Sequence, residues 1–351
     1  MFEAAEIAAA FNAEFAEVLG AVSVLSPTSF RLGDGPAIDA AGQGGAAPWG
    51  WQAQAAAQGG DEPLAKSIQA VLYDRCYARR PAGALTPAAI PSDPEFQQRL
   101  ASANSGRERW EGGWTIQQFA PHGQIFVRKG DRERAAMPGA FISNATPGMA
   151  PQIGSVVLLR AAIEAPGAQP GYYFAFGETL DELAEQLSMI RFYFNCRAED
   201  AAALLGVMTG ELNRFQVPFQ MKAPTAPALY GRADAAVLYV GMRYAAIVLR
   251  LLDGLRASLP LEAPTPLFAR PLWPGIAGAA DPGNGESFGM QRCRLTAEGI
   301  VEAWRGGAQD VAARSAAVAA KFSANGLDLG RPWLAAADAD PFVTPVQATF
   351  A

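Results

Sequence analysis

Residues 191–223 read RFYFNCRAEDAAALLGVMTGELNRFQVPFQMKA, and this stretch decides the fold. Its pattern predicts a strand over Arg191 to Cys196, a helix over Glu199 to Phe215, and a second strand over Val217 to Ala223. The acidic pair at the start of the helix suits the positive end of a helix dipole. A strand–helix–strand unit of this length is typical of a crossover, which indicates a chain of mixed α and β structure.

The residues toward the N-terminus favour helices. Apolar side chains recur at helical spacing over Phe2 to Leu19, Pro63 to Arg80 and Pro91 to Ala103. The segment from Gly33 to Gly60 is rich in glycine, alanine and glutamine, which is typical of a loop or linker.

The residues between these helices and the crossover favour antiparallel strands. Trp114 to Phe119 and Gln124 to Lys129 alternate in polarity around a short turn, which predicts a hairpin. Ser155 to Arg160 and Gly171 to Phe176 are predicted to be two further strands. Residues 110–178 are therefore expected to form a small antiparallel sheet.

The C-terminal part continues the mixed pattern. It predicts a strand over Ala235 to Val240, a helix over Tyr244 to Leu259, a proline-rich crossing over Pro260 to Pro282, and helices over Leu295 to Arg305 and Gln309 to Phe322. The fold class is therefore α+β. We expect a helical N-terminal region over 1–108 with its loop at 33–60, and a second domain over 109–351 that contains the middle sheet and a C-terminal part over 187–335.

Composition excludes several classes of protein. The chain has 351 residues, of which 28 are basic and 34 acidic, so its net charge of -6 argues against a nucleic-acid-binding surface. The most apolar long run, Ala235 to Leu259, is interrupted by charged residues, so no membrane span is expected. Met1 to Gly20 has no basic segment of a signal peptide. These features predict a cytoplasmic protein.

The cysteines and the single histidine limit the possible chemistry. Cys76, Cys196 and Cys293 are far apart and odd in number, which argues against a disulfide framework. His122 lies in a Pro-His-Gly turn, where we expect it to be exposed. Neither a usual zinc site nor a histidine-dependent triad is therefore predicted, and we expect no metal and no cofactor.

Lys222 is the first candidate site residue. The apolar residues Val217, Phe219 and Met221 alternate with polar positions, so Lys222 shares the other face of the strand with Gln220. One interpretation is a solvated lysine at a strand end, which is its most common fate. The other is a base, because a lysine packed among arginines loses part of its preference for the charged form.

Two arginine segments accompany this lysine. Arg232 follows Gly231 and precedes Asp234, so it either pairs with that carboxylate in a turn or forks onto a phosphate or carboxylate ligand. Asp281 to Arg294 is rich in glycine and contains Arg292, and it is either a surface loop or a cradle for an anion. The sequence contains neither nucleotide-binding glycine motif. Together these residues fit an anion-binding pocket.

The same segments carry a resemblance to a known family that extends over most of the chain. The motifs are Leu72-Tyr73 with Tyr77, Gly113-Trp114-Thr115-Ile116, Gly123 to Lys129, Gly171-Tyr172-Tyr173, Tyr193-Phe194-Asn195, Pro218-Phe219 with Lys222, Tyr230-Gly231-Arg232, Val237-Leu238-Tyr239, Pro264 to Phe268, and Glu286-Ser287-Phe288-Gly289-Met290 with Arg292-Cys293. By these motifs the chain resembles the HopA-type effector family, and among its members the lyase component of class V lanthipeptide and thioamitide biosynthesis.

This resemblance implies a phosphoserine and phosphothreonine lyase of peptide natural-product maturation, with a fold related to that of phosphothreonine lyases. A kinase-like partner would phosphorylate a precursor peptide, and the chain would eliminate the phosphate to give dehydroalanine or dehydrobutyrine. It further implies that Lys222 removes the Cα proton and that Arg232 and Arg292 hold the phosphate. Lys129 and Tyr230 are weaker candidates, for the phosphate or as the general acid.

The sequence departs from phosphothreonine lyases at one place. Their strand carries Trp-His, and the comparable pair here is Trp114-Thr115, so the general acid is either another group or is not needed. Two other functions remain open. The chain could bind a phosphopeptide or the kinase without chemistry, or it could be a type III secreted effector that binds host proteins.

Overall fold

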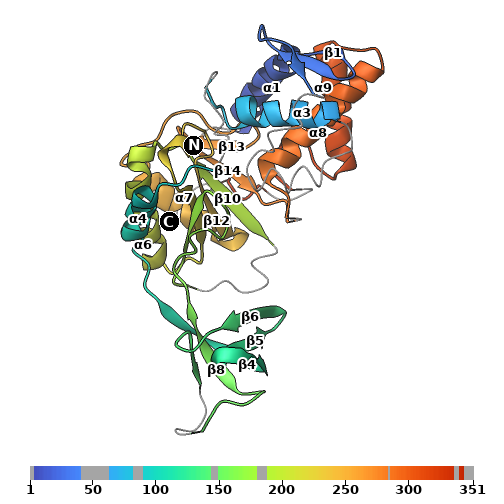
Figure 1. Ribbon diagram of the computed structural model, residues 1–351. Helices are drawn as coiled ribbons and strands as arrows, with labels where there is room; N and C mark the ends of the chain where they lie inside the picture. Colours follow the sequence, from blue (N-terminus) through green and yellow to red (C-terminus); the bar gives the residue numbers. More distant parts are fainter. Residues whose placement is uncertain are drawn as a thin grey trace, which may run out of the picture.

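The computed structural model describes residues 4–40, 63–81, 90–143, 149–179, 188–283, 285–335 and 340–343. Over these residues the fold is α+β, as predicted. Figure 1 shows three parts in a row: a helical cluster, a six-stranded sheet with its own helices, and a small sheet. Most of the segment predicted as a loop over 33–60 lies outside the described residues, but Ile38–Asp39 pairs as a short strand, so the prediction was wrong there.

The helical cluster combines helices from the N-terminal and C-terminal parts of the sequence. Its helices are α1 (Ala4–Ala21), α3 (Pro63–Val71), α8 (Phe288–Arg305) and α9 (Val311–Ala324). Its three-stranded sheet is formed by β1 (Val22–Ser26), β2 (Ser29–Leu32) and β3 (Ile38–Asp39). The buried Arg314 of α9 donates to the carbonyls of Leu19 and Val22, each at 2.5 Å, and so fixes the C-terminal end of α1 against α9.

Residue packing between α8 and α9 depends on one glycine. A Cβ atom built on Gly299 would lie 2.7 Å from the backbone Cα of Val318, so alanine cannot fit unless the two helices separate. We expect Gly299→Ala to lower the free energy of unfolding by about 1–3 kcal/mol. Gly254→Ala in another helix is the control: nothing lies within 4 Å of its Cβ position, so alanine should raise stability by about 0.5–1 kcal/mol. Urea titrations measure both changes, and equal effects would contradict the close helix contact.

The six-stranded sheet is the centre of the protein. Its order is β13–β14–β10–β12–β11–β9, with antiparallel neighbours throughout. The strands are β9 (Tyr172–Phe176), β10 (Met189–Phe194), β11 (Gln220–Pro224), β12 (Ala236–Gly241), β13 (Arg270–Trp273) and β14 (Ile276–Ala280). Helices α4 (Pro94–Ala103), α6 (Ala201–Arg214) and α7 (Ala245–Leu255) lie with this sheet (Figure 1).

The predicted crossover is confirmed, with one addition. Both β10 and β11 run antiparallel to β12, so they are parallel to each other and α6 connects them. Strand β12, which comes later in the chain, lies between them.

Strands β13 and β14 contradict the prediction of a proline-rich crossing over Pro260 to Pro282. The prediction failed because β14 consists mainly of alanine and glycine, which have low strand propensity. Small residues are needed there, since the ring of Phe342 packs so closely that a Cβ on Gly278 would lie 2.4 Å from it.

The small sheet has its own core. Its order is β6–β5–β4–β8–β7, formed by β4 (Arg109–Phe119), β5 (Ile125–Lys129), β6 (Arg132–Ala136), β7 (Phe141–Ser143) and β8 (Val156–Ala161). The hairpin of β4 and β5 was predicted correctly. The predicted extent of the sheet to residue 178 was wrong, because β9 pairs with β11 and buries Tyr173 and Ala175 in the core of the larger sheet.

Candidate active site

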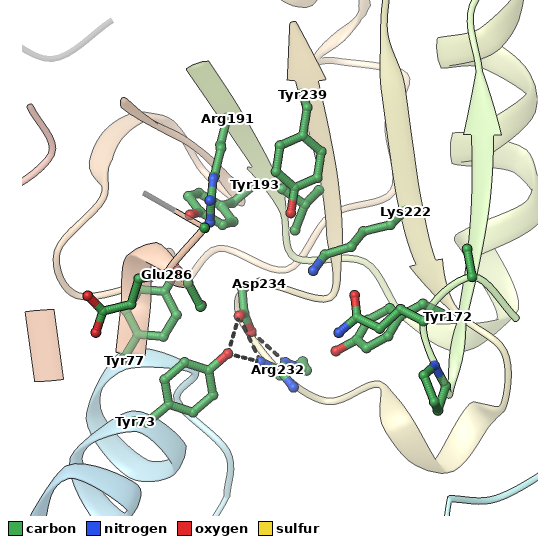
Figure 2. A pocket seen from close by; sticks show the side chains of 16 residues that line it. Tyr73, Tyr77, Tyr172, Arg191, Tyr193, Lys222, Arg232, Asp234, Tyr239 and Glu286 are labelled. Carbon is green, nitrogen blue, oxygen red and sulfur yellow. Dashed lines mark hydrogen bonds and ion pairs between the residues drawn. The ribbon is translucent and has the colours of Figure 1, made fainter. Parts of the chain in front are cut away.

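Lys222 lies in the middle of β11, on the face of the six-stranded sheet that carries polar and aromatic side chains. Its partners across the ladders are Val237 of β12 and Phe174 of β9. Tyr239 and Tyr172 are each two residues from these partners, so they lie on the same face and flank the lysine. The Nζ atom lies 4.8 Å from the ring centroid of Tyr172 and 5.9 Å from that of Tyr239. Figure 2 shows the ammonium group between these two rings.

This face forms the floor of a pocket of about 420 Å³. Strand β10 contributes Arg191 and Tyr193, because they lie opposite Tyr239 and Val237 in the register of β10 and β12. The other walls come from distant parts of the chain. The full lining comprises Tyr73, Tyr77, Ala168, Gln169, Pro170, Tyr172, Arg191, Tyr193, Lys222, Arg232, Asp234, Val237, Tyr239, Gly285, Glu286 and Ser287.

A π-helix places two tyrosines in the wall. Helix α3 continues as the π-helix Leu72–Tyr77, which ends where the amide of Ala78 donates to the carbonyl of Tyr73 at 2.8 Å. The rings of Tyr73 and Tyr77 lie 5.1 Å apart and both face the pocket. Such π-helical segments are rare and are often found at functional sites. Burial raises the pKa of both hydroxyls, so at neutral pH they are protonated donors.

Arg232 and Asp234 form a buried ion pair at the edge of the pocket. Nη2 of Arg232 donates to Oδ2 of Asp234 at 2.7 Å, and Nε donates to Oδ1. Nη2 also donates to the Tyr73 hydroxyl at 2.7 Å, and that hydroxyl donates to Oδ2 at 3.1 Å. Burial alone would raise the pKa of Asp234, but the charge of Arg232 and these hydrogen bonds hold it below its usual value. The predicted pair of Arg232 with Asp234 is therefore confirmed, and Arg232 also lines the pocket, while its other predicted role, a fork onto a phosphate or carboxylate ligand, stays a prediction.

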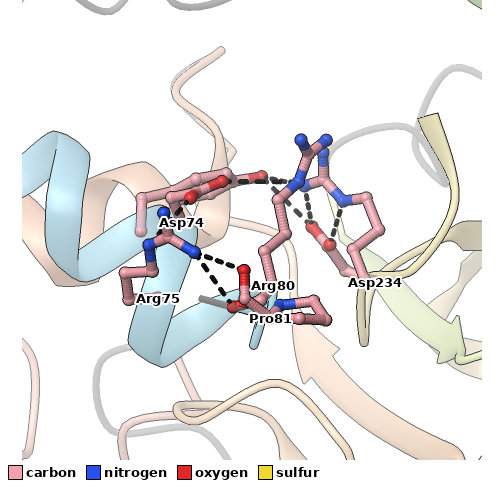
Figure 3. Close-up of polar contacts among 7 residues, drawn as sticks. Asp74, Arg75, Arg80, Pro81 and Asp234 are labelled. Carbon is pink, nitrogen blue, oxygen red and sulfur yellow. Dashed lines mark hydrogen bonds and ion pairs between the residues drawn. The ribbon is translucent and has the colours of Figure 1, made fainter. Parts of the chain in front are cut away.

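A second group of polar contacts lies within the π-helix and the residues that follow it. Asp74 pairs with Arg75 at 3.5 Å and with Arg80 at 3.3 Å, and Arg75 also donates to the carbonyl of Pro81. Figure 3 shows both groups of contacts side by side. The π-helix is tied to the turn that carries Asp234 by the Tyr73 hydroxyl and by the amide of Ala233, which donates to the carbonyl of Ala78 at 2.7 Å.

The second pocket arginine is also paired. Arg191 donates to Oδ2 of Asp281 through Nε at 2.7 Å and through Nη2 at 2.6 Å, and it lies over the ring of Tyr239. Among the residues that the structure describes, Lys222 has no ion-pair partner. Of the basic side chains in the described lining, Lys222 is therefore the one that forms no ion pair with a carboxylate.

The structure places the other predicted site residues away from this pocket. The Tyr230 hydroxyl is buried and donates to the carbonyl of Pro224 at 3.0 Å. Lys129 lies in the small sheet, where its Nζ contacts Glu111 at 2.8 Å. Neither residue is part of the lining. His122 is exposed in its turn, as predicted.

Arg292 lies in the first turns of α8, where a glycine-rich loop was predicted over Asp281 to Arg294. That prediction was wrong from Phe288 onward. Gly289 has a packing role rather than a flexible one, since a Cβ there would lie 2.3 Å from the ring of Tyr77. Arg292 is 1% exposed, and it donates to the carbonyls of Pro332 and Leu334 at 3.0 and 2.9 Å. Burial lowers its pKa to about 10. It holds the C-terminal segment and lies outside the pocket lining.

We therefore expect Arg292→Lys to act on stability. Lysine is a point charge that cannot make the two divergent contacts to Pro332 and Leu334, so the free energy of unfolding should fall by about 2–4 kcal/mol. Thermal unfolding measures the change, with Arg331→Lys as the control because Arg331 is half exposed in a local pair with Asp328. An unchanged melting temperature for Arg292→Lys would contradict this role.

Sequence reasoning missed most of the pocket. Tyr73, Tyr77, Tyr172, Tyr193, Tyr239 and Glu286 all fall inside motifs that carried the family resemblance, but none was singled out as a site residue. Tyrosine is usually a partly buried packing residue, so its type alone gave no functional signal. The register of β9 to β12 was the missing information, because it places these side chains on one face.

Over the described ranges, no cluster of three or more histidine, cysteine, aspartate or glutamate side chains could hold a metal ion. None of the described helices is both long and apolar enough to span a membrane.

The chain matches one family model and resembles several solved structures, two of which are described here. The HopA1 effector protein family matches residues 163–334, just under half of the chain. The structure of an effector protein from Pseudomonas syringae pv. tomato strain DC3000 is 18% identical, with a TM-score of 0.42, over 82% of this chain and 95% of that one. An effector protein from Pseudomonas syringae pv. syringae strain 61 is 15% identical, with a TM-score of 0.42, over 81% and 93% of the two chains. No curated protein matches the chain significantly.

Proposed function

We propose that the chain acts on another polypeptide through the pocket around Lys222, since residues 163–334 match the HopA1 effector protein family. The family's description supports an effector that binds a protein of a host cell. The same segment contains Lys222, Arg232 and Asp234, so the family match and the pocket concern the same part of the chain.

The finer proposal is that the polypeptide is phosphorylated and that the pocket eliminates its phosphate. The observation that carries this proposal is the Lys222 ammonium group, which lies between two tyrosine rings and has no ion-pair partner in the described part of the chain. An unpaired cation in a pocket rich in hydroxyl groups suits an anionic ligand. Phosphoserine and phosphothreonine supply such an anion on a short side chain.

The reaction would be a β-elimination with the following balance. Lys222 first gives its own proton to solvent and then takes the Cα proton as an amine; the electron pair forms the Cα–Cβ double bond, and the Cβ–O bond breaks. Inorganic phosphate leaves with that electron pair, and dehydroalanine or dehydrobutyrine remains. Fixed donors near the leaving oxygen atoms would stabilise the charge that develops there.

The general acid stays open within this proposal. Tyr230 and Lys129, the two candidates from the sequence, both lie outside the described lining. Phosphate can also leave as an anion that the pocket donors stabilise, and this route requires no acid.

The source of the phosphopeptide follows from the family resemblance alone. A kinase-like protein of a cytoplasmic maturation pathway would phosphorylate a precursor peptide and pass it to this chain. A non-catalytic role, in which the pocket only binds the phosphopeptide or the kinase, is the remaining alternative.

The experiment is mass spectrometry of purified protein mixed with phosphoserine and phosphothreonine peptides. Elimination lowers the peptide mass by one phosphoric acid, and it differs from hydrolysis, which loses only the elements of metaphosphate. We expect elimination with the native precursor and its kinase present. A phosphopeptide that binds under those conditions and is never converted would refute the lyase and favour a binding protein.

A further inference from the structure

The start of α8 forms one wall of the pocket. Gly285, Glu286 and Ser287, the three residues directly before this 18-residue helix, all line the cavity. The first amide groups of a helix have no partner inside the helix, and they carry the positive end of its dipole. A helix start in a pocket wall therefore offers donors to an anion.

The residue at this helix start leaves the donors uncapped. Ser287 is at the N-cap position, where a serine side chain normally accepts from an amide of the first turn. Here its side chain makes no capping hydrogen bond. By contrast, the N-cap residues Asp93 of α4 and Asp310 of α9 both accept from such amides, at 2.9 Å.

Tyr193, which packs near the first residue of α8, provides an independent observation. Its side chain is 2% exposed and lines the pocket, and its ring lies 6.2 Å from that of Phe288, the first residue of α8. Its hydroxyl is buried and has no hydrogen-bond partner among the described residues. Burial raises the pKa of Tyr193, and a weak hydrogen-bonding interaction with the nearby Tyr77 hydroxyl opposes this rise, although the two hydroxyls do not meet the full geometry of a hydrogen bond. A buried hydroxyl without a partner is costly, so a ligand atom that accepts from it would be favoured.

Glu286 is the group that could oppose an anion at this place. Both of its carboxylate oxygens are held by Arg294, through Nε at 3.0 Å and through Nη2 at 3.2 Å. Figure 2 shows this carboxylate pointing away from Lys222 and the centre of the pocket. Arg294 lies outside the lining and also binds Glu298 at 3.0 Å, so the two carboxylates share one guanidinium.

The two arginines of the lining are less suitable as the main phosphate site. Arg191 is bound to Asp281 and Arg232 to Asp234, so each brings a carboxylate that repels an anion. The start of α8 also carries a carboxylate, that of Glu286, but Arg294 binds it on the side away from Lys222.

We propose that the start of α8, with the Ser287 and Tyr193 hydroxyls, is the subsite for the phosphate group of a phosphomonoester ligand, in the same cavity as Lys222. This inference rests on the proposed function and specifies where the phosphate group and the Cα–H group would lie in the pocket. The phosphate would be held at the helix start, and the Cα–H of the residue would face Lys222. The helix dipole would then stabilise the negative charge on the phosphate as the Cβ–O bond breaks.

The test compares two variants of the same size. Ser287→Asp and Ser287→Asn both cap the helix start and should keep the fold, but only aspartate adds a negative charge. We expect inorganic phosphate, titrated by calorimetry at low constant ionic strength, to bind Ser287→Asp about tenfold more weakly than Ser287→Asn. Equal affinities for the two variants, or no phosphate binding by the wild-type protein, would overturn the subsite.

A second pair of variants tests the hydroxyl. Tyr193→Phe removes only the oxygen and should weaken phosphate binding by about tenfold, since a hydrogen bond to a charged group is lost. Tyr244→Phe, whose hydroxyl lies outside the lining and contacts Arg243, should bind as the wild type does. Unchanged binding by Tyr193→Phe would remove this tyrosine from the subsite.

The outcome for the subsite is separable from that for the lyase. Phosphate binding is read without turnover, and elimination is read by peptide mass. If phosphate affinity follows these variants but no phosphopeptide is converted, the subsite stands and the lyase does not. If the wild type eliminates phosphate while Ser287→Asp and Ser287→Asn bind phosphate equally, the lyase stands and the subsite is wrong.

Discussion

Replacing Lys222 by alanine is expected to slow the loss of phosphate from a phosphoserine peptide by about 10²–10⁴-fold, the usual contribution of a positioned general base. Lys222 is the proposed proton acceptor, and the two flanking rings of Tyr172 and Tyr239 hold its amine in the pocket. Without the amine, the Cα proton has to be taken by water. The rate is measured by mass spectrometry with the native precursor and kinase present.

Two controls make this result specific. Lys222→Arg keeps the positive charge but cannot act as a base near neutral pH, so it should bind the phosphopeptide and fail to convert it. Lys66→Ala removes a half-buried lysine that lies outside the described lining, and it should leave the rate unchanged. If Lys222→Ala eliminates phosphate at the rate of the wild-type protein, Lys222 is excluded as the base.

Replacing Asp234 by alanine is expected to destabilise the fold by about 3–5 kcal/mol, because it leaves the guanidinium of Arg232 buried without its partner. Arg232 and Asp234 are 6% and 8% exposed, so water cannot substitute for the lost carboxylate. Urea titrations at neutral pH measure the change. Asp253→Ala is the matched control, since its pair with Arg256 is exposed on α7 and should contribute less than about 1 kcal/mol.

The same carboxylate should make stability depend on pH. The pKa of Asp234 is lower in the folded protein than in the unfolded chain, because Arg232 and the hydrogen bonds outweigh the effect of burial. Its contribution is therefore complete above the unfolded value near about 4, and it is lost as the pH falls toward the lowered folded value. The difference in stability between wild type and Asp234→Ala should shrink below about pH 4. A difference that stays constant down to about pH 2 would contradict this linkage.

The double variant Arg232→Met/Asp234→Ala shows how much of the loss of stability in Asp234→Ala comes from the unpaired buried charge of Arg232. The double variant should regain part of the stability lost in Asp234→Ala, since no unpaired charge remains buried. If the double variant is less stable than Asp234→Ala, the main cost lies in packing rather than in the charge of Arg232.

The part of the fold that could be predicted has a regular period in the sequence. The hairpin of β4 and β5 alternates in polarity, and α6 and α9 repeat apolar residues at helical spacing. The elements that were not predicted lack such a regular period. Strand β14 is built of alanine and glycine, and the first turn of α8 contains a glycine, so both looked irregular although both are buried.

The predictions of site residues differ in the same way, according to whether they rest on a regular sequence pattern. The strand pattern predicted that Lys222 faces away from the core side of β11, and the pocket contains it together with Arg232. Arg292, Lys129 and Tyr230 were chosen by residue type and by family resemblance, and each has its donors engaged elsewhere in the fold. Residue type cannot distinguish an arginine that faces a pocket from one that holds a chain end.

The sequence by itself determined the α+β class, the crossover from β10 to β11 and the polar face on which Lys222 lies, because these follow from local periodicity. Only the tertiary structure decided which side chains share the pocket. The insertion of β12 between β10 and β11 places Arg191, Tyr193 and Tyr239 near Lys222. The docking of the π-helix and α8 then adds the remaining walls. These arrangements depend on contacts between residues far apart in the chain, and a local pattern carries no information about them.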